Sequence, residues 1–309
     1  MSLESLTAGG EKALLLGSAL WGWGTQKEEV FAILDTFAAA GGGVLDTAAN
    51  YPINNVPGDF GRASALISEW LRGRRPENVS VLYKIGSIDN RGSSASALRD
   101  SDVLLSAELA RGKFSDWLGG IAIHWDNRDD PRAIEGSLDI FSHLAAEGLS
   151  VGFSGVKRPD LYLKYAPDLA TKWLIQVKEN LSTQFARKGY EAYFPSAQFL
   201  AYGINMGGVK GFQTTPTSSL TLRGLEVPSI VERLQRFIDE PPPDLAAPPS
   251  DLNQLALMAS WANPSLSGVI LGSRTAIQLT ESLNYWADLS ARNDAADVFR
   301  ITSTLSDIA

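Results

Sequence analysis

The feature of this sequence that most constrains its fold is a regular alternation of short apolar runs with longer amphipathic segments. Each apolar run is too short for a helix and shows little polar–apolar alternation, which is typical of strands buried on both faces. Eight such runs occur, at residues 13–16, 44–46, 79–85, 121–125, 149–154, 173–177, 195–200 and 268–271. A chain of this kind favours a parallel sheet covered by helices.

The intervening segments have the spacing of amphipathic helices. They lie at residues 27–40, 63–72, 98–111, 132–147, 160–169 and 252–261. We expect Thr25 to cap the first helix and Ser250 to cap the last. About eight strand–helix units in 309 residues predict an α/β fold, the (β/α)₈ barrel.

The predicted barrel forms a single domain over residues 1–309, with one exception to the repeat. Residues 203–249 hold a single helical pattern, 228–240, among many Gly, Thr and Pro residues. A connection of this length commonly carries function or forms a lid. We therefore expect a long loop insertion around residues 203–249.

The amino-acid composition limits the kinds of site and partner that this chain can have. The chain has no Cys and two His, which excludes disulfides, thiol nucleophiles and multi-His metal sites, so we predict no metal. Its net charge of −8 argues against a nucleic-acid partner. No apolar run approaches the roughly 18 residues of a membrane span, and residues 1–12 have no apolar core of signal-peptide length. We expect a cytoplasmic protein that acts on a small molecule, with no membrane partner; the sequence leaves the oligomeric state open.

Four polar side chains stand near the ends of three consecutive runs. The second run ends at Asp46 and leads into Tyr51. The third contains Lys84, and the fourth carries His124 near its end. Because the active site of a parallel barrel lies at the carboxyl ends of its strands, these groups are expected to converge. Each also has a structural interpretation: a loop cap for Asp46, a packing role for Tyr51 and a purely structural ion pair for Lys84.

Together the four groups suit proton transfer to a carbonyl oxygen. A phenol is a poor acid at neutral pH, but a nearby cation stabilises the phenolate, so Tyr51 next to Lys84 becomes a general acid. Asp46 would keep Lys84 charged, and His124 would bind the substrate oxygen. The chain's second histidine, His143, falls on a predicted helix and is expected to be structural. No side chain supplies hydride, whereas a nicotinamide cofactor does.

The cofactor would lie across the mouth of the barrel, because no G-x-G-x-x-G motif follows a strand. The last run leads through Gly272, Ser273 and Arg274 into a helix. A glycine turn at a helix N-terminus binds phosphate through backbone N–H groups, and a guanidinium suits a phosphate monoester. We predict NADP(H) as the preferred cofactor and NAD(H) as the alternative.

The sequence resembles the aldo-keto reductase family over nearly its whole length. The segments that carry the resemblance are Trp21-Gly22-Trp23-Gly24, Leu45-Asp46-Thr47-Ala48 with Tyr51, Lys84, Ile121-Ala122-Ile123-His124-Trp125-Asp126, Gly152-Phe153-Ser154, Ile175-Gln176, and Gly272-Ser273-Arg274 with Gln278 and Glu281. Asp46, Tyr51, Lys84 and His124 match the family's catalytic tetrad. The resemblance implies reduction of aldehydes or ketones, or oxidation of alcohols and sugars, with NADP(H) or NAD(H).

The same resemblance implies a cofactor site. Ser154 and Gln176 would hold the carboxamide, and the adenosine end would lie against Ser273, Arg274, Gln278 and Glu281. Several positions depart from the family; among them, Gly155 replaces a common Asn, and Ala197 stands where many members stack a tyrosine on the nicotinamide. Aromatic residues near strand ends would form the substrate pocket: Trp21, Trp23 and Trp125.

Three functions remain open at this level. The first is an NADP(H)-dependent oxidoreductase with Tyr51 as general acid and base. The second is a Schiff-base aldolase that uses Lys84 or Lys178, since barrel lyases place an imine lysine near a strand end. The third is a nicotinamide-binding partner subunit with vestigial turnover.

Overall fold

The computed structural model describes residues 12–208, 219–222, 224, 226–227 and 229–305. Eight parallel strands pair in chain order and close into a barrel, as predicted. The strands are β1 Ala13–Gly17, β2 Gly43–Ala48, β3 Val79–Ile85, β4 Leu118–Asp126, β5 Ser150–Val156, β6 Leu174–Lys178, β7 Gln198–Tyr202 and β8 Gly268–Leu271.

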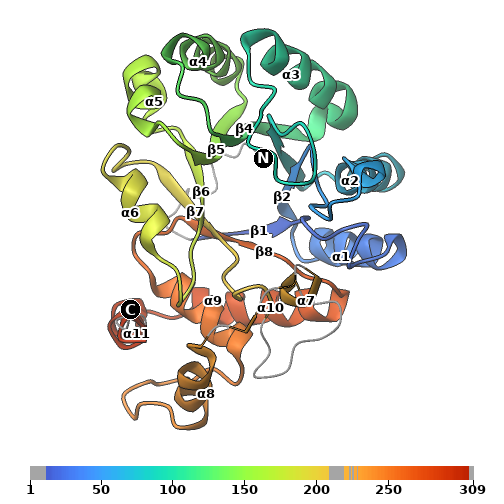
Figure 1. The fold of residues 1–309 in the computed structure, drawn as a ribbon. Coiled ribbons are helices and arrows are strands. Elements are labelled where there is room, and N and C mark those ends of the chain that lie inside the picture. The colour runs from blue at the N-terminus through green and yellow to red at the C-terminus, as the bar shows by residue number, and fades with distance from the viewer. Residues whose placement is uncertain (1–11, 209–218, 223, 225, 228, 306–309) are drawn as a thin grey trace.

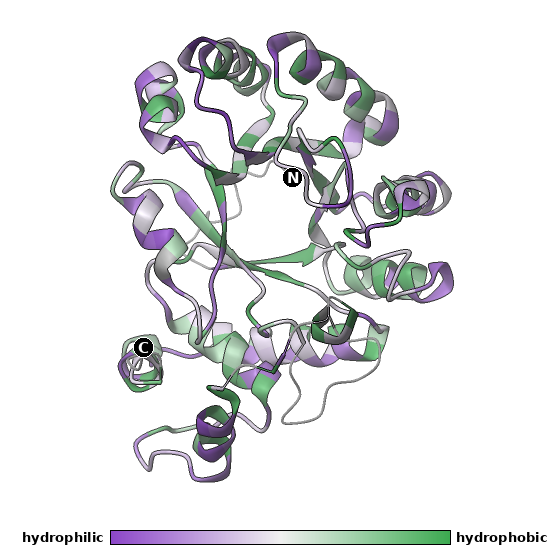
Figure 2. Ribbon diagram, in the orientation of Figure 1, coloured by the Kyte–Doolittle hydropathy of each residue, from purple (hydrophilic) through white to green (hydrophobic). Residues whose placement is uncertain are grey.

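Helices surround the barrel, and their apolar faces turn toward the strands (Figures 1 and 2). Two of them, α8 and α11, pack on α9 outside the main ring. The α-helices are α1 Lys27–Ala39, α2 Arg62–Arg74, α3 Asp100–Phe114, α4 Pro131–Ala146, α5 Pro159–Tyr165, α6 Phe185–Glu191, α7 Ser219–Leu222, α8 Val231–Asp239, α9 Leu252–Ala262, α10 Ala276–Ser290 and α11 Ala295–Ser303. No helix among the described residues is both long and apolar enough to cross a membrane.

Two of the predicted helix caps are wrong. Gln26, not Thr25, is the N-cap residue of α1, and the Thr25 hydroxyl is buried without a partner among the described residues. At α9 the cap is Asp251 rather than Ser250, because the Asp251 carboxylate accepts from the N–H of Gln254 at 2.8 Å. In both cases the cap lies one residue closer to the helix than expected.

The stretch 203–249 contains more structure than the single helical pattern that we predicted. Both α7 and α8 fall within it, and α8 covers most of the expected segment. Residues 209–218, 223, 225 and 228 of this stretch lie outside the described residues.

The interior of the barrel is built in layers, because alternate residues of a strand face the same side. The first inward layer is apolar and forms one contact cluster: Leu15, Val44, Leu82, Ala122, Leu174, Leu200 and Ile270. Two residues further along, the inward positions of β2 to β7 are polar: Asp46, Lys84, His124, Ser154, Gln176 and Tyr202. The fold therefore places a ring of polar groups above an apolar plug.

Candidate active site

A buried ion pair lies at the centre of this polar ring. Lys84 is 1% exposed and its ammonium group contacts the carboxylate of Asp46. The second carboxylate oxygen, Oδ1, accepts from Nε2 of Gln176 at 2.6 Å. Burial alone would lower the pKa of Lys84, but Asp46 and the Tyr51 phenol raise it above its usual value. Lys84 is therefore a cation in a dry site.

Tyr51 lies directly over this cation. The Lys84 Nζ atom is 5.0 Å from the centroid of the Tyr51 ring. Hydrogen bonds hold the backbone on both sides of the ring: the Tyr51 N–H donates to Ala48 at 3.3 Å, and the Tyr51 carbonyl accepts from Ala63 at 3.2 Å. The ring is almost buried and meets the edge of His124 at a centroid distance of 5.6 Å.

His124 is buried and neutral. Burial, assisted by the Lys84 cation, lowers the pKa of His124 well below its usual value. Its Nδ1 atom lies 3.1 Å from Oδ1 of Asn50 and 3.4 Å from Oγ of Ser87. The ring of Trp125 stacks on the imidazole at a centroid distance of 4.1 Å. The structure thus brings Asp46, Tyr51, Lys84 and His124 together, as the sequence predicted.

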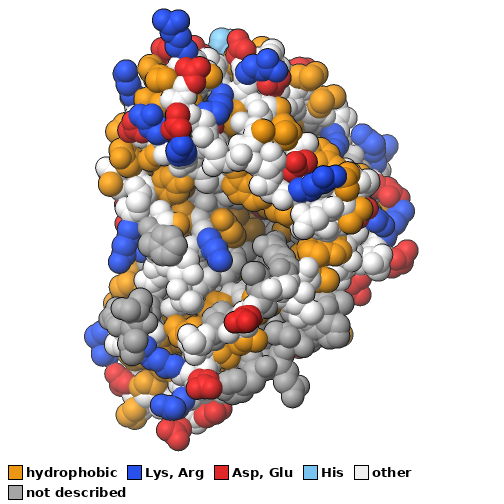
Figure 3. Space-filling view, viewed as in Figure 1, with side chains coloured by type: hydrophobic (Ala, Val, Ile, Leu, Met, Phe, Trp, Pro, Cys, Tyr) orange, Lys and Arg blue, Asp and Glu red, His pale blue; other side chains and the backbone are white. Residues whose placement is uncertain are grey.

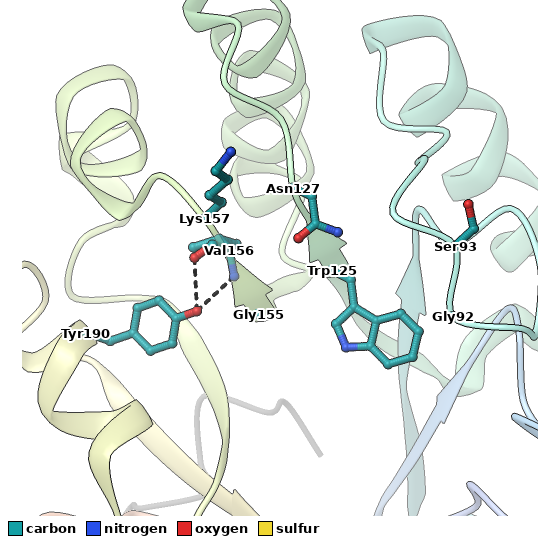
Figure 4. Close-up of a pocket in the computed structure, with 8 residues that line it drawn as sticks. All are labelled: Gly92, Ser93, Trp125, Asn127, Gly155, Val156, Lys157 and Tyr190. Atoms are coloured by element: carbon teal, nitrogen blue, oxygen red, sulfur yellow. Dashed lines mark hydrogen bonds between the residues drawn. The ribbon is translucent and has the colours of Figure 1, made fainter.

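A pocket of about 470 Å³ opens beside this group (Figure 4). Trp125 is the residue that links the two, because its ring stacks on His124 and also lines the pocket. The residue has φ +60°, an uncommon value for a side chain of this size. Gly155 has φ +81°, and a Cβ there would lie 3.1 Å from the indole Cδ1, so an asparagine would crowd Trp125. The absence of the expected Asn and the position of Trp125 are therefore coupled.

The backbone that carries Trp125 is fixed by the next residue. The Asp126 carboxylate is buried and receives two hydrogen bonds of 2.8 Å from the Arg128 guanidinium. The Tyr162 hydroxyl donates to the same carboxylate, also at 2.8 Å. This anchor holds the carboxyl end of β4 in place.

The loop after β8 approaches the first turn of α10. Thr275 caps the helix by accepting from the Gln278 N–H at 3.2 Å, and the Gln278 side chain accepts from the Arg274 N–H at 3.4 Å. The carboxylate of Glu29, on α1, accepts from the Ala276 N–H at 2.7 Å. Gln278 thus orders the loop itself, and an anionic side chain already lies at this helix N-terminus.

Comparison with known proteins identifies the family. The aldo/keto reductase family matches residues 13–176, more than half of the chain. The chain belongs to the aldo/keto reductase family. A putative aryl-alcohol dehydrogenase from Saccharomyces cerevisiae is 26% identical over 149 residues, which span 45% of this chain and 66% of that protein. The chain thus matches slightly less than two thirds of the length of this relative.

A solved structure shares the fold of this aldo/keto reductase. The structure of an aldo-keto reductase from Bacillus halodurans in its holo form superposes with a TM-score of 0.68 at 17% sequence identity. The match covers 96% of this chain and 92% of the other. At this level of identity the likeness extends to the fold alone.

The structure places the three aromatic residues predicted for the substrate pocket in different surroundings. Trp21 is 1% exposed and packs in the hydrophobic core, and it is not among the residues that line the pocket described above. Trp23 is half-buried and Trp125 lines the pocket described above.

The sequence did not single out two residues near the site: Tyr202, which belongs to the polar ring, and Asn50, which contacts His124. Tyr202 ends β7, and its pKa is raised by burial and by Tyr51, while Lys84 and a hydrogen bond with Ser154 oppose the rise. Ala197, to which we compared the family's tyrosine, lies before the strand. Our prediction of this strand at 195–200 ended two residues too early and so excluded Tyr202. Nothing in the sequence indicates that Asn50 is buried at the site, because a polar residue in a turn is usually solvated.

Proposed function

We propose that this aldo/keto reductase transfers hydride between NADP(H) and an aldehyde, ketone or alcohol, with Tyr51 as general acid and base. The observation that carries the proposal is the buried Lys84 cation, fixed by Asp46 and placed against the Tyr51 phenol. Such a cation stabilises the phenolate that forms when Tyr51 releases its proton.

Each group in the site has a defined task in this reaction. In reduction, the Tyr51 hydroxyl donates its proton to the carbonyl oxygen, and in oxidation the phenolate takes the proton of the alcohol. Lys84 stabilises the phenolate in both directions, and Asp46 with Gln176 holds Lys84 in place. The bound nicotinamide supplies or accepts the hydride. Burial of these groups excludes water and strengthens the electrostatic effect of Lys84.

The inward polar ring fits a nicotinamide. Ser154, the Gln176 amide oxygen and the Tyr202 ring border the same mouth as the ion pair, and hydroxyl and amide groups suit a carboxamide. At the other end, a Cβ built on Gly272 would meet no atom within 4 Å, which leaves room for a ligand to approach the loop backbone. Ser273, Arg274 and Glu281 are proposed to hold the adenosine end.

The pocket beside His124 supports an aromatic substrate. Trp125 and Tyr190 give it two aromatic walls, while Ser93 and Asn127 supply polar groups (Figure 4). The printed name of the yeast relative, a putative aryl-alcohol dehydrogenase, points in the same direction. We therefore propose that the substrate carries an aromatic ring beside its carbonyl or carbinol carbon.

The two rival functions are less well supported. A Schiff-base lysine must be neutral to attack a carbonyl, whereas Asp46 keeps Lys84 charged and Lys178 is exposed at the end of β6. The complete set of Tyr51, Lys84, Asp46 and His124 weighs against a partner subunit with vestigial turnover.

The test has two parts. NADPH and NADH are titrated against tryptophan fluorescence, and a panel of aromatic aldehydes, aliphatic aldehydes and sugars is then followed at the nicotinamide absorbance. We expect the cofactor to bind with a dissociation constant in the submillimolar to micromolar range. We also expect the aromatic aldehydes to be turned over. Cofactor-free borohydride trapping of a carbonyl on Lys84 would instead support the aldolase. Tight cofactor binding without turnover of any substrate would support the partner subunit.

A further inference from the structure

The pocket beside His124 contains one charged side chain that the proposed reaction does not use. Lys157 directly follows β5, and it lines the pocket together with Trp125 and Tyr190 (Figure 4). None of the lining residues that the structure describes is an Asp or a Glu. The lining of this pocket therefore carries a positive charge, although the whole chain has a net charge of −8.

Backbone hydrogen bonds hold Lys157 at the carboxyl ends of two neighbouring strands. Its N–H donates to the carbonyl oxygen of Asp126, the last residue of β4, at 2.8 Å. The N–H of Val156 donates to the Tyr190 hydroxyl oxygen at 2.8 Å, and the same hydroxyl donates to the Val156 carbonyl oxygen at 3.1 Å. Because Trp125 immediately precedes Asp126, these bonds fix the backbone of Lys157 relative to both aromatic walls of the pocket.

The ammonium group of Lys157 can exchange its present partner for a ligand. It contacts the carboxylate of Asp129, in the loop between β4 and α4, and both side chains are more than half exposed. An exposed ion pair of this kind contributes little to stability, so its replacement by another carboxylate costs little. Asp129 itself does not line the pocket. Lys157 can therefore turn to an anion in the pocket without leaving a buried charge unpaired.

Two neutral side chains of the pocket add hydrogen-bond donors. The amide nitrogen of Asn127 makes a long bond of 3.5 Å to a backbone carbonyl oxygen. The Ser93 hydroxyl oxygen accepts from a backbone N–H at 3.1 Å, which leaves the hydroxyl proton available to a ligand. In the view of Figure 4, the side chains of Lys157, Asn127 and Ser93 all lie above the Trp125 ring. The pocket thus combines aromatic walls with a cation and two donors.

We propose that Lys157 binds a carboxylate on the aromatic ring of the substrate, with Asn127 and Ser93 as further donors. The proposal rests on the proposed function and specifies its substrate class: aromatic aldehydes that carry a carboxylate on the ring, and the corresponding alcohols. Lys157 is then a specificity-determining residue. The carboxylate takes no part in the transfer of the proton or the hydride, so the role of Tyr51 is unchanged.

The size of the preference follows from the surroundings of Lys157. A hydrogen bond between an ammonium and a carboxylate is stronger than one to a neutral acceptor. Because the Lys157 side chain is partly exposed, water screens this attraction and the gain is modest, about threefold to tenfold in binding. Added salt should reduce the gain further.

Paired substrates measure this preference in turnover. 3- and 4-Formylbenzoate are compared with 3- and 4-formylbenzamide, which have nearly the same shape but no charge. For at least one ring position, Lys157→Met should lower the acid-to-amide ratio of kcat/KM by about threefold to tenfold, and Lys157→Glu should lower it further. Differences in intrinsic reactivity cancel when the wild-type ratio is divided by the ratio of the variant.

Two further variants serve as controls. Asp129→Asn removes the competing carboxylate and should raise the acid-to-amide ratio. Lys172→Met removes the same charge from an exposed lysine just before β6, at the opposite end of the barrel, and should keep the wild-type ratio. A ratio that Lys157→Met leaves unchanged at both ring positions would overturn the proposal.

Isothermal titration calorimetry measures the same contact without turnover. 3- and 4-(Hydroxymethyl)benzoate and the matching amides are titrated into the protein with and without NADPH, so that the alcohols have no oxidant to react with. We expect at least one acid to bind about threefold to tenfold more tightly to the wild type than to Lys157→Met, whereas the amides bind equally to both. Equal affinities of the acids for the two proteins would contradict the role of Lys157.

The outcomes separate this inference from the proposed function. If the acids bind in a Lys157-dependent manner but no aldehyde is turned over with either cofactor, the proposed function fails and the substrate class fails with it, while the contact between Lys157 and a carboxylate is supported. If aldehydes are reduced and Lys157→Met changes neither the kinetic ratio nor the affinity, the proposed function holds and the inference fails.

Discussion

At the scale of single residues, the candidate site is built around one buried ion pair, between Lys84 and Asp46. Bringing an ammonium and a carboxylate out of water is costly unless both are well paired. Here each oxygen of Asp46 has a donor, one from Lys84 and one from Gln176. The pair is thus satisfied from three different strands, and its position over the apolar plug fixes where Tyr51 must lie to use it.

Tyr51→Phe removes the proposed acid and base while ring volume hardly changes. The rate of carbonyl reduction should fall by at least about two orders of magnitude, in line with typical acid–base contributions. NADPH affinity, measured by fluorescence titration, should stay nearly the same. Tyr83→Phe is the matched control, because this tyrosine on the same barrel packs against Phe114 of α3 and should leave turnover unchanged. Retention of most of kcat in Tyr51→Phe would refute the assignment.

Lys84→Met keeps a long apolar stem and leaves the Asp46 carboxylate buried without its cation. Activity should be lost and the free energy of unfolding should fall by about 3–5 kcal/mol, measured by urea denaturation. The double variant Asp46→Asn with Lys84→Met removes the uncompensated charge, so it should recover much of the stability but none of the activity. Equal stability of the wild type and Lys84→Met would show that the pair is not buried in this way.

At the scale of whole elements, the strands position these residues, because alternate side chains of a strand face the same side of the sheet. The inward face changes from apolar to polar within two residues on β2 to β4 and on β6, where Val44, Leu82, Ala122 and Leu174 precede the polar groups. A one-residue shift in the register of any of these strands would turn its polar group toward the helices. At α10, by contrast, the helix end contributes its own N–H groups, and Glu29 of α1 already accepts from one of them.

The choice of cofactor is predicted to depend on this end of α10. Arg274→Ala should weaken NADPH binding by roughly tenfold to a hundredfold and leave NADH nearly unchanged, because the guanidinium would bind the 2′-phosphate through a charged hydrogen bond. Dissociation constants for both cofactors, measured by fluorescence titration, test this difference.

Glu29→Gln supplies the control for that prediction. It removes a carboxylate from the helix N-terminus while keeping an acceptor for the Ala276 N–H. A 2′-phosphate near this end would then be repelled less, and NADPH should bind a few-fold more tightly. Equal losses of NADPH and NADH in Arg274→Ala would mean that Arg274 contacts a part common to both cofactors or supports the loop.

At the scale of the whole molecule, contacts between the first and last strands, and between the segments next to them, close the barrel. β1 pairs with β8, and Lys12, just before β1, donates to the carbonyl groups of Ser260 and Asn263 at the end of α9. On the face in Figure 3, Lys and Arg side chains are interspersed with Asp and Glu. Mixed charge of this kind offers the described part of that face no continuous basic patch for nucleic acid.

Lys12 is predicted to make the free energy of unfolding increase with pH in the alkaline range. Burial lowers the pKa of Lys12 from 10.5 to about 8, although Glu179 opposes the shift. Between these values the unfolded chain holds the proton more tightly than the folded one, so the free energy of unfolding rises with pH. From pH 7.5 to 10 this rise should amount to about 2 kcal/mol.

Urea denaturation of Lys12→Met at both pH values isolates this effect. The variant should lack the rise, and the exposed Lys172→Met should retain it. A wild type and a Lys12→Met variant with the same pH dependence would contradict the prediction.

The sequence by itself determined the barrel, because eight buried strands separated by amphipathic helices have few other ways to pack. It also predicted that Asp46, Lys84 and His124 lie close together, because they follow apolar residues on consecutive strands whose carboxyl ends must meet. These are local patterns combined with one topological rule.

The tertiary structure decided the rest. Strand β7 continues to Tyr202 because its backbone pairs with β6 as far as Lys178, beyond the end of the apolar run, and this brings Tyr202 into the polar ring. The burial of Trp21, the bond between Asn50 and His124, and the carboxylate of Glu29 at α10 all join segments far apart in the chain. Periodicity reports which side of an element is buried, whereas these contacts depend on how separate elements meet in space.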